Sequence, residues 1–255
     1  MDEGVFLMTY GSLPSIPRST MVYGDTSGRV IDRLPLSLAV IRTASSTVVF
    51  DVGASPAWAR RKEVLGYVDP RELLEDEGPG IDSVDCIVLS HLHWDHASNL
   101  AAFAGPTIVV QRRELEGWRA ALSWGPAFAW VHAGRVEADL VEHLEMDSAT
   151  RLADGDIDLG NGVRCHLAPG HTFGTQFVSV FDRTRQVVLA SDVVFVRENL
   201  ERMIPLGNGL DQVEMLRSFR RVGELEARGA LVVPGHDPDL EGRFERVSDR
   251  TVRIA

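Results

Sequence analysis

The chain has 255 residues, of which 44% are hydrophobic and 25% charged, a balance typical of a globular protein with a core of ordinary size. Its 37 acidic residues outnumber its 26 basic residues and give a formal charge of -11, which disfavours nucleic acids and anionic membrane surfaces as partners. No stretch has the length of a membrane span, and the acidic N-terminus does not resemble a signal peptide, so we expect a cytoplasmic protein. No linker-like segment interrupts the chain, so we expect a single domain over residues 1–255.

The first half of the chain alternates strand-like and helical patterns. A strand over 5–9 precedes a Gly- and Pro-rich stretch, 11–17, that we expect to be a loop. A hairpin follows, with strands over 36–42 and 47–50. The remaining elements predicted here are helices over 56–65 and 70–77, a buried strand over 86–89, a short helix over 99–103, a strand over 107–110 and a helix over 114–122.

The second half is richer in strands. Apolar runs separated by turn signals predict strands over 156–159, 163–167, 176–181 and 186–189, an amphipathic helix over 213–226 and a last buried strand over 230–233. Because strands occur in both halves with helices between them, we expect an α/β fold in which two packed sheets are flanked by helices.

The most informative segment is 91–96, His-Leu-His-Trp-Asp-His, which directly follows a predicted buried strand. Neutral imidazoles and carboxylates suit zinc and other divalent transition ions. His91 and His93 can share one side of an extended loop, while Asp95 and His96 turn toward a second point, so that the segment can supply two metal positions. A solvated, histidine-rich loop is the alternative, but three of the chain's eight histidines lie in this one hexapeptide, which disfavours it.

Three further residues can complete such a site. His171 follows Pro-Gly, Asp192 comes just after a predicted strand, and His236 follows Pro-Gly at the end of another strand. Strand ends and glycine-bearing turns are where site residues collect. Singly, each of the three is as easily an ordinary residue, but together with the hexapeptide they make seven candidate ligands.

The pattern His-x-His-x-Asp-His, followed by a downstream His, an Asp and another His, resembles the metallo-β-lactamase superfamily. Asp51, in Phe-Asp-Val-Gly, is similar to the family's Asp-x-Gly strand end, which braces the metal loop from behind the ligands. The resemblance implies an αββα sandwich of two mixed sheets with the metals at one edge.

The resemblance also implies how the candidate ligands divide. His91, His93 and His171 would hold one metal ion, Asp95, His96 and His236 the other, and Asp192 would bridge the two. We therefore expect two divalent metal ions per chain, zinc in the first place, although the same ligands accept manganese, iron or cobalt.

Within this superfamily, the segments 90–99, 169–172 and 234–237 resemble the N-acyl-homoserine lactone lactonases. Such an enzyme is a quorum-quenching hydrolase that opens a lactone, or cleaves a related ester, with a metal-bridging hydroxide. Asp95 and Asp192 are then the catalytic residues, and Asp95 also passes a proton to the leaving group. The lactonases carry a Tyr whose hydroxyl assists the substrate carbonyl; here that position is Phe195, so either catalysis proceeds without this donor or the substrate differs.

The same ligands also allow other functions. A persulfide dioxygenase-like enzyme would hold a single iron with ligands like His91, His171 and Asp192, and metal analysis would distinguish it. A thioesterase of the same fold is less favoured, because the chain ends soon after His236 and leaves no room for a C-terminal helical domain. A metal-binding protein without catalytic activity would bind the ions but turn over no substrate.

Aromatic residues concentrate next to the metal segment. Trp94 lies among the ligands, so we expect it to line the cleft, with Phe195 packing against an apolar group of the substrate. Trp118, Trp124 and Trp130 lie close together in sequence and are candidates for a pocket wall or lid, with core packing or a dimer contact as the alternative. The expected partner is a small lactone or ester, and a homodimer is left open.

Overall fold

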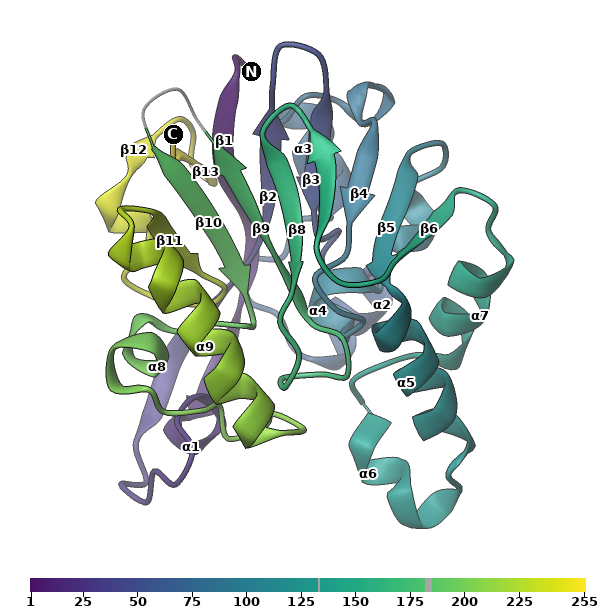
Figure 1. Ribbon diagram of the computed structural model, residues 1–255, viewed down its shortest axis with the longest axis vertical. Coiled ribbons are helices and arrows are strands. Elements are labelled where there is room, and N and C mark those ends of the chain that lie inside the picture. The colour runs from purple at the N-terminus through teal and green to yellow at the C-terminus, as the bar shows by residue number, and fades with distance from the viewer. Residues whose placement is uncertain (133, 182–184) are drawn as a thin grey trace.

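The computed structural model describes residues 1–132, 134–181 and 185–255, which form two β-sheets packed face to face with helices on both outer faces (Figure 1). Within this part of the chain the larger sheet has eight strands and the smaller has five. In spatial order, the larger sheet consists of β12 (Glu245–Arg246), β13 (Thr251–Arg253), β1 (Gly4–Pro17), β2 (Val30–Arg42), β3 (Thr47–Phe50), β4 (Cys86–Val88), β5 (Thr107–Gln111) and β6 (Thr150–Ala153). The smaller consists of β11 (Leu231–Pro234), β10 (Gln186–Ser191), β9 (Gln176–Phe181), β8 (Val163–Leu167) and β7 (Ile157–Gly160).

The helices cover the outer face of each sheet. Against the larger sheet pack α2 (Pro56–Arg61), α3 (Pro70–Asp76), α5 (Arg112–Ser123) and α7 (Ala138–Met146); against the smaller pack α8 (Arg197–Arg202) and α9 (Gln212–Ala227). The short helices are α1 (Arg18–Met21), α4 (Trp94–Ala97) and α6 (Ala129–His132), and the 3-10 turns are η1 (Ile81–Ser83), η2 (Leu100–Ala102), η3 (Pro126–Phe128) and η4 (Glu241–Arg243). Among the helices described, none is long and apolar enough to cross a bilayer.

Alternation of side chains along the strands produces the layers. Val5 and Leu7 of β1 point into the core between the two sheets, where they join residues such as Val178 of the smaller sheet. Phe6 and Met8, their neighbours in sequence, point the other way, into the core under the helices. Because successive side chains of a strand face opposite sides, one apolar strand contributes to two cores. The sheets each contain parallel and antiparallel pairs, so the predicted αββα sandwich of two mixed sheets is confirmed.

The structure corrects the prediction of a loop over 11–17. These residues continue β1, which pairs with β2 as far as the register Pro17 with Val30 and so forms a two-stranded ribbon beyond the sheet. A proline needs only a position whose missing N–H faces away from the partner strand, and a ribbon of two strands offers such positions. The prolines of this stretch are therefore part of a strand in a two-stranded ribbon and do not indicate a loop.

Two predicted helices are shorter in the structure. The helix over 56–65 begins as expected, with the Ser55 side chain accepting a hydrogen bond from the backbone of Trp58, but it ends at Arg61. It ends there because Glu63 adopts a left-handed backbone conformation, with φ of 54°, which no α-helix continues through. The helix over 99–103 is reduced to the 3-10 turn η2.

Gly117 of α5 lies where a side chain has no room. A Cβ atom at this position would be 2.3 Å from Cγ of Phe173, which belongs to the connection between β8 and β9. Gly223 of α9 is different, since a Cβ there would meet nothing closer than 3.9 Å.

We therefore expect opposite effects from the same substitution in these two helices. Gly223→Ala should stabilise the fold by about 0.5–1 kcal/mol, because alanine has the better helix propensity. Gly117→Ala should destabilise it by about 1–3 kcal/mol, because the added methyl group overpacks against Phe173. Urea denaturation of the two variants measures both signs, and stabilisation by Gly117→Ala would contradict this packing.

Candidate metal centre

The seven candidate ligands lie where strands of both sheets end. The hexapeptide follows β4 of the larger sheet, and its second half forms α4. His171 lies in the connection between β8 and β9, Asp192 follows β10, and His236 follows β11. Residues far apart in the sequence are thus brought to one edge of the sandwich, and all but Asp95 are buried.

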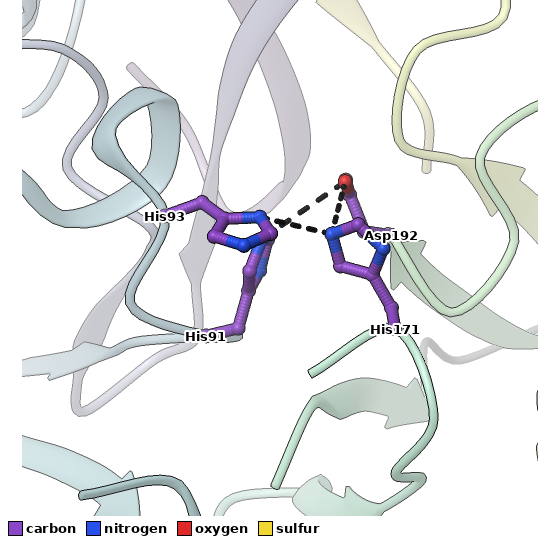
Figure 2. Close-up of side chains that lie close together, drawn as sticks. All are labelled: His91, His93, His171 and Asp192. Carbon is purple, nitrogen blue, oxygen red and sulfur yellow. Dashed lines mark hydrogen bonds and ion pairs between the residues drawn. The ribbon is translucent and has the colours of Figure 1, made fainter. Parts of the chain in front are cut away.

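One group consists of His91, His93, His171 and Asp192, whose side chains turn toward a common point in Figure 2. Nε2 of His171 lies 3.0 Å from Nδ1 of His93 and 3.1 Å from Oδ2 of Asp192. Nε2 of His91 lies 3.9 Å from the same oxygen. Ligand atoms about 2.0–2.1 Å from a tetrahedral zinc ion lie about 3.3 Å from one another, so these spacings suit a shared ion.

A second group consists of Asp95, His96 and His236. Nε2 of His96 lies 3.3 Å from Nε2 of His236, and these two atoms lie 3.8 Å and 4.0 Å from Oδ2 of Asp95. The division of the hexapeptide between the two groups follows the alternation expected from its sequence.

Asp192 connects the two groups through its two oxygens. Oδ2 faces His91 and His171 of the first group. Oδ1 lies 3.3 Å from Nε2 of His96 and 3.0 Å from Nε2 of His236 in the second. One carboxylate with an oxygen toward each set of imidazoles has the arrangement of a ligand that bridges two ions.

The hydrogen bonds that the histidines make on the side away from the centre of each group are consistent with metal binding. Nδ1 of His96 lies 2.8 Å from a carboxylate oxygen of Asp51, and Nδ1 of His236 lies 2.8 Å from the carbonyl oxygen of Pro35. Each of these nitrogens therefore donates its proton outward, so that in the neutral ring the lone pair on Nε2 points inward. Two facing lone pairs cannot bond to each other but can share a cation. Nε2 of His91, likewise buried, has no hydrogen-bond partner among the described residues.

Asp51 holds this arrangement from behind. Its carboxylate accepts hydrogen bonds from the backbone N–H of Ser90 at 2.7 Å and from the Ser90 hydroxyl at 2.8 Å, besides that from His96. The Ser191 hydroxyl, next to Asp192, donates to it at 3.3 Å. Asp51 thus ties the ligand loop of the larger sheet to the strand end of the smaller one.

The charges of the cluster balance only when it holds cations or protons. Burial, together with neighbouring imidazoles, lowers the pKa of His91 and of His93 well below the usual value, so both rings are neutral and ready to bind metal. Burial also acts to lower the pKa of His96, but the carboxylates of Asp192, Asp95 and Asp51 outweigh it and raise this pKa well above normal. Without metal, protons therefore compensate the carboxylates, and binding of ions must displace them.

Glu114, in α5, was not identified from the sequence. Its buried carboxylate accepts hydrogen bonds at Oε1 from the backbone of Leu92 (3.0 Å) and the indole of Trp118 (2.7 Å). At Oε2 it accepts from the hydroxyl of Thr172 (2.7 Å) and the backbone of Gly174 (2.6 Å). Burial raises the pKa of Glu114, while these four hydrogen bonds oppose that rise. The residue fixes the hexapeptide loop relative to the loop that carries His171.

Tyr10 is a second residue that the sequence did not identify. It lies fully buried in β1, and its hydroxyl donates a 2.7 Å hydrogen bond to the backbone carbonyl of Asp95. The phenol thereby fixes the first turn of α4, from which the Asp95 side chain extends.

A cavity of about 170 Å³ opens onto His93, Asp95 and Asp192. Trp94 and Phe195 line it, as expected; the Trp94 ring stacks on Trp58 with centroids 5.7 Å apart, and the Phe195 ring lies 4.4 Å from that of His236. The other lining residues are Leu13, Ile16, Thr20, Leu34, Lys62, Gly134, Arg135 and Asn208.

The structure does not bring the other predicted aromatic residues into this lining. Trp118 is fully buried behind His93, with the ring centroids 5.7 Å apart, because its face of α5 turns toward the core. Trp124 and Trp130 come after the end of that helix and are 45% and 68% exposed. The expected pocket wall of Trp118, Trp124 and Trp130 is therefore not part of the cavity lining. Trp118 packs behind His93, and the other two are surface side chains.

Comparison with known proteins gives a consistent result. Residues 32–236 match the model of the metallo-β-lactamase superfamily. An N-acyl homoserine lactonase of Bacillus sp. is 29% identical over 233 residues, covering 85% of this chain and 86% of its own length. A solved N-acyl homoserine lactone hydrolase with N-hexanoyl-L-homoserine at its catalytic metal centre superposes with a TM-score of 0.80 at 22% identity, covering 97% of this chain and 98% of its own. A dizinc quorum-quenching lactonase superposes with a TM-score of 0.74 at 16% identity, covering 100% and 95%.

Replacing Glu114 tests its role in holding the two loops. Glu114→Gln turns one accepting oxygen into a donor that faces other donors, so we expect a loss of about 2–3 kcal/mol in stability and weaker metal binding. Glu116→Gln, at an exposed position of the same helix, is the matched control. Unfolding by urea and metal content after dialysis are the measurements, and equal behaviour of the two variants would contradict the assignment.

Acid should remove the metal ions before the protein unfolds. The imidazole ligands bind metal only when neutral, and the neighbouring carboxylates raise the pKa of His96 and of His236, so protons compete with the ions for these two ligands as the pH falls. We therefore expect about two ions per chain at about pH 8 and fewer at about pH 5. Metal analysis of the dialysed protein, with circular dichroism to verify folding, measures this. The same metal content at both pH values would refute it.

Proposed function

This chain belongs to the metallo-β-lactamase superfamily, and we propose that it is a metal-dependent hydrolase that opens N-acyl homoserine lactones with a pair of divalent ions, zinc in the first place. The observation that carries the proposal is the position of Asp192, with one oxygen toward each of two ligand groups. The names of the similar proteins add the substrate class and the quorum-quenching role.

When bound, the pair of ions supplies the positive charge that activates water and polarises the carbonyl group of the substrate. The protein holds these ions through the residues of the two groups and moves the proton. Asp95 suits proton transfer, because its side chain is 14% exposed and lines the cavity, while His96 and His236 are buried behind it. Its carboxylate can take a proton from the attacking water and give it to the departing alkoxide oxygen of the opened ring.

The cavity limits which lactones fit. Its volume of about 170 Å³ lies below the range of roughly 300–1,000 Å³ usual for larger ligands, which favours a short acyl chain. Phe195 supplies an apolar surface beside His236 but no hydroxyl that could donate to the carbonyl oxygen. Leu13, Ile16 and Leu34 add apolar lining on the ribbon side.

A single-iron enzyme of the same fold is the less favoured alternative. It would need only ligands like those of the first group, whereas Asp95, His96 and His236 form a second group with converging donor atoms. The expected metal content is therefore about two ions per chain, as in the pH experiment above.

The zinc-loaded protein should open N-acyl homoserine lactones and prefer short acyl chains. Proton release on ring opening, followed for a series of chain lengths alongside aryl esters and thioesters, measures this. Opening of no lactone by protein that holds two ions would refute the lactonase proposal, even if an ester or thioester were cleaved.

Asp95→Asn tests the proposed proton transfer. We expect kcat to fall by about a hundredfold or more, because asparagine cannot exchange the proton. Asp139→Asn, at an exposed position of α7, is the control that removes a carboxylate far from the ligand groups. Metal content must be measured for both variants, so that loss of an ion is distinguished from loss of proton transfer; an Asp95→Asn variant that keeps both ions and full kcat would rule out this role.

A further inference from the structure

Lys62 is the single lysine of the chain; the other 25 of its 26 basic residues are arginines. It follows the last residue of α2 and lines the cavity over the candidate metal centre. Its ammonium group lies 5.6 Å from the ring centroid of Trp58 and 5.5 Å from that of Trp94. Because α2 ends at Arg61, Lys62 lies just outside the helix.

Arg135 reaches the same cavity from the segment between α6 and α7. Its backbone carbonyl accepts a 2.7 Å hydrogen bond from the N–H of Trp94, which fixes the segment against the hexapeptide. Its guanidinium donates to the backbone carbonyl of Asn208 at 3.3 Å. Nζ of Lys62 lies near Gly134, the neighbour of Arg135, since a Cβ there would be 3.8 Å from it, and the charge of Arg135 acts on Lys62.

No described residue offers either cation an ion pair, whereas several arginines elsewhere in the described part of the chain have one. Arg18, Arg197 and Arg221, for example, each pair with a carboxylate. Asp95 acts on Lys62 only from beyond ion-pair distance, and its carboxylate already belongs to the second ligand group. Burial lowers the pKa of Lys62, an effect that the nearby Asp95 only partly opposes, and burial also lowers the pKa of Arg135.

We infer that Lys62 and Arg135 together bind an anionic group of the substrate, so that the preferred lactone has a short acyl chain ending in a carboxylate. This rests on the hydrolase function proposed above. On a protein of formal charge -11, two like charges in the lining of one cavity offer an anionic group a place to bind. The apolar residues Leu13 and Ile16 exclude water and strengthen an ion pair formed there.

Stacking on tryptophan does not explain why both Lys62 and Arg135 line the cavity. It would explain why Lys62 lies over Trp58 and Trp94, but Arg135 stacks on no ring among the described residues. Asn208, another lining residue, has an Oδ1 atom with no hydrogen-bond partner among the described residues, and this acceptor would suit the N–H of an acyl amide if the substrate reached it. A carboxylate-bearing N-acyl group supplies both features.

Two substrates of equal shape test the inference: N-succinyl homoserine lactone, whose acyl chain ends in a carboxylate, and N-succinamoyl homoserine lactone, which ends in a neutral amide. For the zinc-loaded protein we expect kcat/KM to be higher for the carboxylate by about tenfold or more, mainly through KM. A ratio near one, or a preference for the amide, would overturn the inference. In that case opening of both lactones would leave the proposed hydrolase function intact, whereas opening of neither would reject that function.

The ratio of the two kcat/KM values should fall in Lys62→Met and in Arg135→Met, and it is unaffected by a general loss of activity. Arg61→Met is the matched control, because Arg61 also lies over the Trp58 ring, at 4.6 Å, but does not line the cavity. We expect the control to keep the ratio of the parent protein. An unchanged ratio in both cavity variants would overturn the inference.

A measurement that needs no turnover separates binding from catalysis. Because Lys62 is the single lysine, acetylation by an amine-reactive reagent followed by peptide mass mapping reports on this one side chain and on the N-terminus. The ring-opened N-succinyl homoserine should slow acetylation of Lys62 more than the ring-opened N-succinamoyl compound does, with the N-terminus as internal reference. Equal protection by the two compounds would count against the inference even if the protein proves to be inactive on lactones.

Discussion

The buried carboxylate of Asp192 lies between two sets of imidazoles, and this placement is the constraint on which the rest of the site depends. Burying carboxylates and five histidines together costs much desolvation free energy unless cations or protons compensate the charge. One oxygen of Asp192 faces His171 in the first group and the other faces His236 in the second, so both groups share the negative charge of this carboxylate. Rigid strand ends from both sheets are needed to hold such donors in place, and the αββα sandwich provides them.

Two further buried carboxylates make this geometry stable without contacting the central point of either group. Asp51 joins the ligand loop after β4 to the end of β10, and Glu114 joins the same loop to the connection that carries His171. Each accepts several hydrogen bonds from backbone or hydroxyl groups, which is what keeps a buried charge tolerable. The ligands are therefore held by loops that are themselves connected to each other across the two sheets.

The sequence predicts which side chains gather into the two groups because their signal is local. His91, His93, Asp95 and His96 lie within one hexapeptide after a strand, and the later ligands each follow a strand or a Pro-Gly turn. The layered fold also follows from strand patterns, since apolar alternation is a property of neighbouring residues. Glu114 carries no such signal: on a predicted amphipathic helix it resembles any solvent-exposed glutamate, and only tertiary packing buries it. Tyr10 and Lys62 were missed for the same reason, since their partners lie far away in the sequence.

The walls of the cavity and the ligands come from different kinds of segment. Every candidate ligand follows or precedes a core strand, whereas Lys62 follows the short helix α2 and Arg135 follows α6, which lies beyond the end of α5 and away from the sheets (Figure 1). Surface segments of this kind vary in length and charge at little cost to stability. Substitutions in these two segments can therefore change the lining of the cavity without moving the strand ends that carry the candidate ligands.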